Sequence, residues 1–192
     1  MPLLFVVPIS AGTISIQPST LTVTFGQNVS IGVNAAGVAD LYGYQFDLGF
    51  NPAVLAATSI TEGAFLPGAG ATFLLPGTID KLAGGIVATA ESLVGTIPGA
   101  NGGGSLATVN FKALAVGTSA VTLSNVTLLD SNLSTITAVS ANGLVSVNVV
   151  PEPSTWTLIL VSMVPSTLWT ILRSRHGTYR QDREHFSGTT VL

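Results

Sequence analysis

The sequence has few side chains of the kinds that catalyse reactions or bind metals. Its 192 residues include no cysteine, and both histidines, His176 and His185, follow an apolar run near the C-terminus. Residues 1–150 therefore lack a Ser–His nucleophile pair, a His-ligated zinc site and a disulfide. Their six acids are scattered, so a glycosidase-type carboxylate pair is possible only in principle. We predict no enzymatic activity and no cofactor.

Two loops begin like ligand sites but lack necessary residues. Asp130-Ser131-Asn132 starts like a calcium loop, yet Thr135 stands where that loop needs glycine, and no glutamate ends it. The Asn-Gly-Gly-Gly stretch at 101–104 has neither the lysine nor the helix of a phosphate loop. Six acids against two lysines give residues 1–150 a net charge of −4, which disfavours nucleic acid as a partner.

A few polar residues are candidates for contact with a protein partner. They lie on the outward side of a predicted strand at 42–50 and in a predicted loop: Gln45, Asp47, Asp130 and Asn132. The alternative is that all four are ordinary solvated positions.

The elements that must position these residues are β-strands. Apolar and polar residues alternate with a period of two, most clearly over 42–50, where Tyr44, Phe46 and Leu48 share one face. We predict a hairpin from 21–25 and 29–34, a bulge or a bend at Ser124-Asn125, and loops at 63–70 and 98–104. Further strands are predicted at 56–61, 72–75, 81–90, 106–114, 120–129 and 144–149. The spacing of about nine short strands predicts an all-β sandwich.

The C-terminal part predicts one transmembrane helix. Residues 156–172 contain no charged residue and no histidine, and as a helix they would be about 25 Å long. Arg173 and Arg175 follow, as on the cytoplasmic flank of a span, so residues 1–150 would lie outside the cytoplasm and 176–192 would form a short cytoplasmic tail. A buried helix of a soluble protein is the alternative.

At the N-terminus, the apolar stretch 3–11 ends in small residues, as signal peptides do. We interpret residues 1–11 as the remnant of a signal peptide whose start lies upstream. A first β-strand is the alternative.

The segment that joins these two parts resembles a known sorting signal. Pro151-Glu152-Pro153, then an apolar span, then clustered arginines, is similar to the PEP-CTERM signal of Gram-negative bacteria over residues 150–175. That resemblance implies export to the cell envelope and processing by an exosortase, a membrane-embedded transpeptidase. Pro165 within the span and the long tail after the arginines depart from the usual pattern.

Residues 12–149 resemble a second family, the cohesin domains. The similarity rests on residues 44–55, 105–113, 121–133 and 142–147, and covers most of 13–148 in order. It implies a nine-stranded jelly-roll sandwich that holds dockerin modules. The outward Asn and Asp with which well-known cohesins contact dockerin correspond here to Gly43 and Gln45.

Together these features predict a non-catalytic, exported module for protein–protein attachment, anchored in the membrane at its C-terminal end. Its partner would be a surface protein or a dockerin-like module. The alternative is a carbohydrate-binding module for exopolysaccharide or for polysaccharide breakdown.

Overall fold

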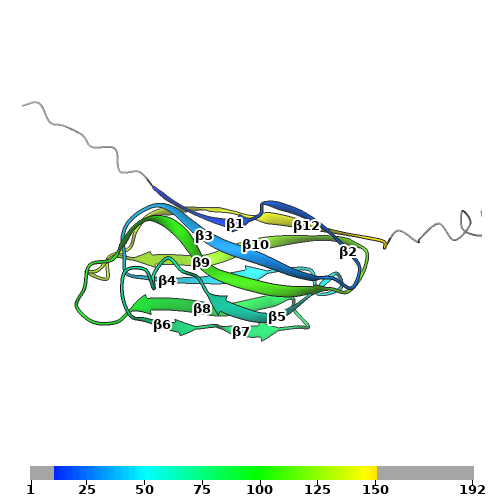
Figure 1. The fold of residues 1–192 in the computed structure, drawn as a ribbon, viewed down its shortest axis with the longest axis horizontal. Coiled ribbons are helices and arrows are strands. Elements are labelled where there is room, and N and C mark those ends of the chain that lie inside the picture. Colours follow the sequence, from blue (N-terminus) through cyan, green and yellow to red (C-terminus); the bar gives the residue numbers. More distant parts are fainter. Residues whose placement is uncertain (1–10, 151–192) are drawn as a thin grey trace, which may run out of the picture. The chain divides into compact units, whose positions relative to one another are not determined.

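The computed structural model describes residues 11–150, which form twelve β-strands and no helix (Figure 1). They belong to one compact unit that ends at Val150. Within this described part, no helix is long and apolar enough to cross a bilayer. The predictions on residues 1–10, on the sorting motif, on the span 156–172 and on its flanking arginines fall outside the described residues.

The strands form two sheets that face each other. One sheet has the order β11–β1–β3–β9–β5. Its strands are β1 (Gly12–Gln17), β3 (Asn28–Leu41), β5 (Leu55–Glu62), β9 (Ala100–Ala113) and β11 (Ala138–Ala141). The other has the order β2–β12–β10–β4–β8–β6, with β7 also paired to β8. Its strands are β2 (Thr20–Thr24), β4 (Gly43–Gly49), β6 (Thr72–Leu75), β7 (Thr78–Asp80), β8 (Gly85–Leu93), β10 (Gly117–Leu129) and β12 (Gly143–Asn148).

The core lies between the two sheets and follows the predicted alternation. In β4, Tyr44, Phe46 and Leu48 are each at most 4% exposed, whereas Gln45 between them is exposed. Phe111 of β9 comes from the opposite sheet and meets Phe50 edge to face, with ring centroids 5.2 Å apart. Because successive side chains of a strand point to opposite faces, this pattern fixes which side of each sheet is buried. The predicted sandwich is confirmed.

Three details of the prediction are wrong. The sandwich has twelve strands where about nine were expected: β7 and β11 are too short to show a period, and β1 (Gly12–Gln17) was not among the predicted strands. The predicted hairpin does not form: β2 pairs with β12 in one sheet, and β3 pairs with β1 and β9 in the other. The predicted loop 98–104 belongs largely to β9, which starts at Ala100.

The glycines of 101–104 explain the third error. A Cβ on Gly103 would lie 2.5 Å from the carbonyl oxygen of Ala35, so only glycine permits the close approach of β9 to β3 there. A glycine run that is usually typical of a loop here extends a strand.

Candidate partner-binding face

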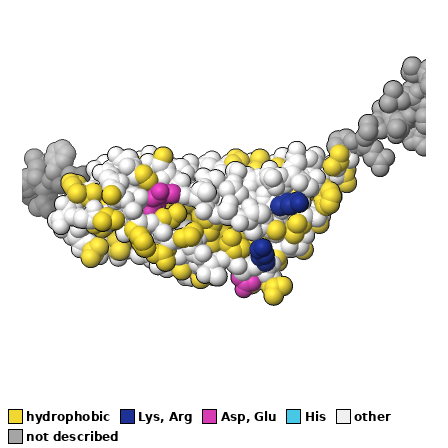
Figure 2. Space-filling view, turned by 60° about the horizontal axis from the view of Figure 1, so that its bottom comes forward, with side chains coloured by type: hydrophobic (Ala, Val, Ile, Leu, Met, Phe, Trp, Pro, Cys, Tyr) yellow, Lys and Arg dark blue, Asp and Glu magenta, His cyan; other side chains and the backbone are white. Residues whose placement is uncertain are grey.

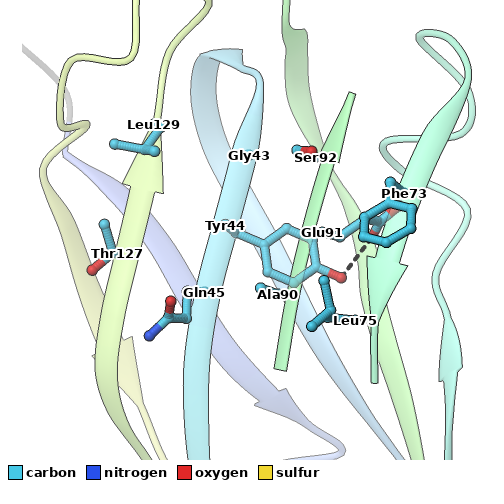
Figure 3. Close-up of a pocket in the computed structure, with 10 residues that line it drawn as sticks. All are labelled: Gly43, Tyr44, Gln45, Phe73, Leu75, Ala90, Glu91, Ser92, Thr127 and Leu129. Carbon is cyan, nitrogen blue, oxygen red and sulfur yellow. Dashed lines mark hydrogen bonds between the residues drawn. The ribbon is translucent and has the colours of Figure 1, made fainter. Parts of the chain in front are cut away.

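The outer face of the larger sheet carries a shallow groove of about 260 Å³ (Figure 3). Two rows of residues cross four neighbouring strands to form it, as the pairing register shows. The first row is Leu129, Gly43, Ser92 and Phe73. The second row is Thr127, Gln45, Ala90 and Leu75. Gly43, Ser92 and Ala90 are small residues on the central strands β4 and β8, and Leu129, Phe73 and Leu75 are larger residues at the ends of the rows, which hollows the sheet surface.

The groove has an apolar, uncharged wall. Phe73 is 61% exposed and Leu75 50%, and both stand on β6 at the edge of the sheet. Gln45 is the longest exposed polar side chain that lines it, since the lining Tyr44 and Glu91 are buried. Exposed apolar residues that gather in this way mark sites of protein association more often than chance exposure does. An open hollow smaller than the usual 300–1,000 Å³ of ligand pockets fits side chains of a macromolecule better than an enclosed small molecule.

The structure separates the two sequence candidates on β4. Gln45 is exposed in the groove. Asp47 lies on the same face, but its carboxylate is occupied: Oδ1 accepts a hydrogen bond of 2.7 Å from the Ala88 amide, and Oδ2 one of 2.6 Å from Asn125 Nδ2. Ala88 and Asn125 have φ of 59° and 50°, and the register shifts beside each. Asp47 therefore fixes two β-bulges, one on each neighbouring strand, and the bulge predicted at Ser124-Asn125 is confirmed.

The other two candidates lie in the loop after β10. Asp130 Oδ1 accepts hydrogen bonds from the amides of Asn132 and Ser134, both 2.8 Å, so this carboxylate closes its own turn. Asp40 binds the same loop through Ser131, whose hydroxyl donates to Asp40 Oδ2 at 2.6 Å. That bond, followed by one from the Gly99 amide, lowers the pKa of Asp40 below its ordinary value. Sequence reasoning missed Asp40, which ties two loops together at this end of the sandwich.

Beneath the groove lies a buried carboxyl group that the sequence did not reveal. Glu91 of β8 is 2% exposed, and Tyr44 of β4 is 4% exposed. The Tyr44 hydroxyl oxygen is 2.6 Å from Glu91 Oε2 and 2.7 Å from the Leu106 carbonyl oxygen (Figure 3 shows the Tyr44–Glu91 contact). Glu91 shares the inward phase of Leu93, two residues on, which is the one sequence signal of its burial.

The geometry at Tyr44 favours a neutral Glu91 carboxyl. A tyrosine hydroxyl has one hydrogen, but here it lies between two oxygens that only accept when Glu91 is ionised. When Glu91 is neutral, its carboxyl donates to the tyrosine oxygen and the tyrosine donates to the carbonyl, so both contacts are hydrogen bonds. Burial raises the pKa of Glu91 to about 7, with the Tyr44 hydrogen bond lowering it and the Glu62 carboxyl raising it. Burial and then Glu91 raise the pKa of Tyr44.

Two of the six acids, Glu62 and Glu91, influence each other, since Glu62 raises the pKa of Glu91. Glu62 is exposed at the end of β5, and its Oε1 accepts a hydrogen bond from Thr72 Oγ1 of β6. A glycosidase needs both carboxyls open to a sugar ring. The burial of Glu91 closes one of them, and the hydrogen bond between Glu62 and Thr72 links β5 of one sheet to β6 of the other.

Comparison with known protein families shows which family this chain belongs to. The family model described as Cohesin domain matches residues 14–147, which is most of the chain. The chain belongs to the cohesin family. Cohesin domains are non-catalytic modules of protein–protein interaction, in agreement with the prediction of no enzymatic activity. No curated protein matches the sequence.

Solved cohesins share the fold. The non-cellulosomal cohesin of the archaeon Archaeoglobus fulgidus matches with a TM-score of 0.58 and 15% identity, over 72% of this chain and 92% of that one. A cohesin in complex with a dockerin from Clostridium thermocellum gives 0.60 and 12%, over 73% and 95%. The sixth cohesin of scaffoldin B from Acetivibrio cellulolyticus, in complex with a Cel5 dockerin mutant, gives 0.59 and 21%, over 72% and 100%. At these identities the likeness establishes the fold alone.

The opposite face of this cohesin is different in character. Apart from Lys112 near the end of β9, the central outward residues of β3, β9 and β5 are short and uncharged, and they bind one another. The Ser30 hydroxyl donates to Asn110 Oδ1 at 2.7 Å, and Asn110 Nδ2 donates to Ser59 Oγ at 3.0 Å. In residues 11–150 the exposed large aromatic residues are Phe25, in the turn after β2, and Phe73, on β6. The described part therefore offers no pair of aromatic platforms for sugar rings.

Proposed function

We propose that this cohesin is an exported attachment module that holds a protein partner in the groove formed by β10, β4, β8 and β6. The observation that carries the proposal is the pair of exposed apolar side chains, Phe73 and Leu75, beside a hollow floored by Gly43 and Ala90. Such a groove suits an apolar side chain of the partner, ringed by polar contacts to Gln45 and Thr127.

A dockerin-like module is the partner class that the family suggests, with altered contacts. Several of the similar solved cohesins are described in complex with dockerins. The groove in this chain has no exposed acidic or basic side chain, because Gly43 and Gln45 are the outward residues of β4 that line it and the lining Glu91 is buried. We therefore expect apolar contact to dominate, with an affinity that changes little between low and high salt.

Export and anchoring complete the proposal. The Pro151-Glu152-Pro153 motif supports sorting by an exosortase to the envelope of a Gram-negative bacterium. The uncharged run 156–172, followed by Arg173 and Arg175, supports a C-terminal span that holds the module outside the cytoplasm until it is processed or released.

Capture of a partner with matched variants tests the binding site. Residues 1–150 are immobilised and exposed to envelope extract, as the parent form, as Phe73→Asp/Leu75→Asp, and as Val139→Asp. Val139 is 60% exposed on β11 of the other sheet, so its variant adds a charge at similar exposure away from the groove. We expect a protein that the parent and Val139→Asp retain and that the groove variant loses, with about a tenfold or greater fall in affinity.

The same forms are applied to a glycan array. If glycans retain the protein and no protein partner is captured, the proposed protein attachment is wrong and the carbohydrate-binding alternative holds. Equal capture by all three forms would place the binding site elsewhere. Circular dichroism of each variant shows that the sandwich is intact, as expected for substitutions of exposed side chains.

A further inference from the structure

One end of the sandwich, where the described chain stops at Val150, combines exposed apolar side chains with both lysines. Backbone hydrogen bonds bring its turns together: Phe25 N to Asn148 O, Gly26 N to Ala113 O, and Leu114 N to Val54 O. We call this end the exit pole. Its large exposed apolar residues are Phe25 (52% exposed), Leu82 (94%), Leu114 (43%), Val116 (55%) and Val149 (66%).

Charge is distributed unevenly along the molecule. Lys81 follows β7 in the turn that holds Leu82, and Lys112 is the last exposed residue before β9 ends. Figure 2 shows the dark blue side chains toward the end at which the described residues stop. With Asp80, the two lysines give the exit pole a formal side-chain charge of +1, whereas the other five acids give the remainder −5.

The chain between Val150 and Trp156 is short, so the start of the uncharged run must stay near the exit pole. Six residue steps separate Val150 from Trp156, where the uncharged run begins, and fully extended they reach about 20 Å. β3 alone has 14 residues and is about 45 Å long, so the opposite end of the sandwich is much farther from the start of that run than the exit pole is.

We infer that the exit pole is a membrane-contacting surface, with its apolar side chains in the headgroup layer and Lys81 and Lys112 at anionic lipid headgroups. Exposed Phe and Leu beside Lys is the composition by which proteins lie at a bilayer interface, and lysine stems extend along it to reach the charge. The inference rests on the proposed anchoring by residues 156–172. It adds an orientation: the sandwich stands with its exit pole on the bilayer and its opposite end, with Asp40 and Asp130, away from it.

Fluorescence quenching by lipids tests this orientation on the full chain. The sequence has no cysteine, so Val116→Cys at the exit pole and Asn132→Cys in the loop after β10 each give one labelling position for an environment-sensitive dye. The labelled protein is incorporated into vesicles of phosphatidylcholine with about a quarter phosphatidylglycerol, and headgroup spin-labelled lipid is added as quencher. We expect strong quenching at 116 and little at 132.

Further variants separate the two forces. In the Val116→Cys background, Phe25→Ser/Leu82→Ser lowers quenching in all lipids, and Lys81→Gln/Lys112→Gln lowers it only when anionic lipid is present. Each lysine removed lowers the ratio of docked to undocked protein by about fivefold. Leu133→Ser, which removes an exposed leucine of the loop after β10, leaves quenching unchanged.

Two failures are distinguishable. If the chain inserts into vesicles but dyes at 116 and 132 are quenched equally or not at all, the orientation is wrong and the anchor stands. If the chain does not associate with vesicles, both the anchor and the orientation are wrong.

Discussion

Stability of the sandwich is expected to depend on pH through Glu91. The carboxyl has a pKa of about 7 in the fold, against an ordinary value of 4.5. The folded protein therefore binds more protons than the unfolded chain between these values. The slope of the unfolding free energy against pH is proportional to the number of protons bound by the unfolded state minus the number bound by the native state. The Glu91 contribution to the free energy of unfolding therefore falls as pH rises from 4.5 to about 7 and is constant above about pH 7.

The magnitude follows from the size of the shift. A pKa difference of about 2.5 corresponds to about 3.4 kcal/mol at 1.36 kcal/mol per pKa unit. The part due to burial is retained, since Glu91 is 2% exposed. The part due to Glu62 is reduced, because Glu62 is exposed and water screens its charge. We therefore expect a loss of about 2 kcal/mol across this range.

Urea unfolding of residues 1–150, followed by circular dichroism at about pH 5 and about pH 8, measures this loss. Residues 1–150 contain no histidine, the side chain that ordinarily titrates within this interval. Glu91→Gln keeps a hydrogen-bonding group beside Tyr44 and cannot ionise. Its unfolding free energy is expected to be the same at both pH values.

Glu62→Gln provides the matched control. It removes the neighbouring charge and leaves Glu91 buried, so its pH dependence lies between those of the parent and of Glu91→Gln. Equal slopes for the parent and Glu91→Gln would refute the reasoning, since the buried carboxyl would then be ionised or solvated in the fold at neutral pH.

Substitutions at Asp47, Gly63 and Phe111 test other parts of the structure by urea unfolding, with controls at Asp47 and Gly85. Asp47→Ala removes the hydrogen-bond acceptor of both bulges and is expected to lower the free energy of unfolding by about 2 kcal/mol. Asp47→Asn keeps one acceptor and is expected to lower it by less. Equal losses for the two variants would show that the carboxylate does not stabilise the bulges. Gly63→Ala places a Cβ 2.1 Å from the Ser105 carbonyl oxygen and is expected to cost about 3 kcal/mol. Gly85→Ala, whose nearest neighbour would be 3.9 Å away, is expected to change little. Phe111→Ala removes a 1% exposed core ring and is expected to cost about 3–5 kcal/mol, and a loss below 1 kcal/mol would contradict its central place.

The sequence predicts which residues are buried better than it predicts which strands are partners. Tyr44, Phe46 and Leu48 share a parity that any pairing must respect, so their burial is readable. The pairing partner of β2 cannot be predicted in this way, because the alternation of residues in β2 suits either sheet. Its pairing with β12 depends on contacts with residues more than 120 positions away in the sequence. Asn101 to Gly104 was misleading because glycine is common both in loops and where backbones approach closely.

For the candidate site, too, the sequence predicts local orientation better than it predicts which strands are neighbours. Gln45 was predicted at an outward position and lines the groove, but the hollow itself depends on Phe73 and Leu75 coming beside Ser92 and Ala90, a pairing that no local pattern specifies. Glu91 was missed because the predicted strand ended one residue before it, and an acid is rarely expected inside a core.

The parallel pairing of the terminal strands has a mechanical consequence. β2, near the start of the described chain, runs alongside β12, the last strand, through a five-residue register from Thr20–Leu144 to Thr24–Asn148. β1 and β11 are likewise parallel over four pairs. A pull that draws the two chain ends apart along the strands loads these ladders in shear, so their hydrogen bonds must fail together, not one after another as in an opening zipper. A module pulled by its two chain ends along the strands would therefore resist rupture best in this direction.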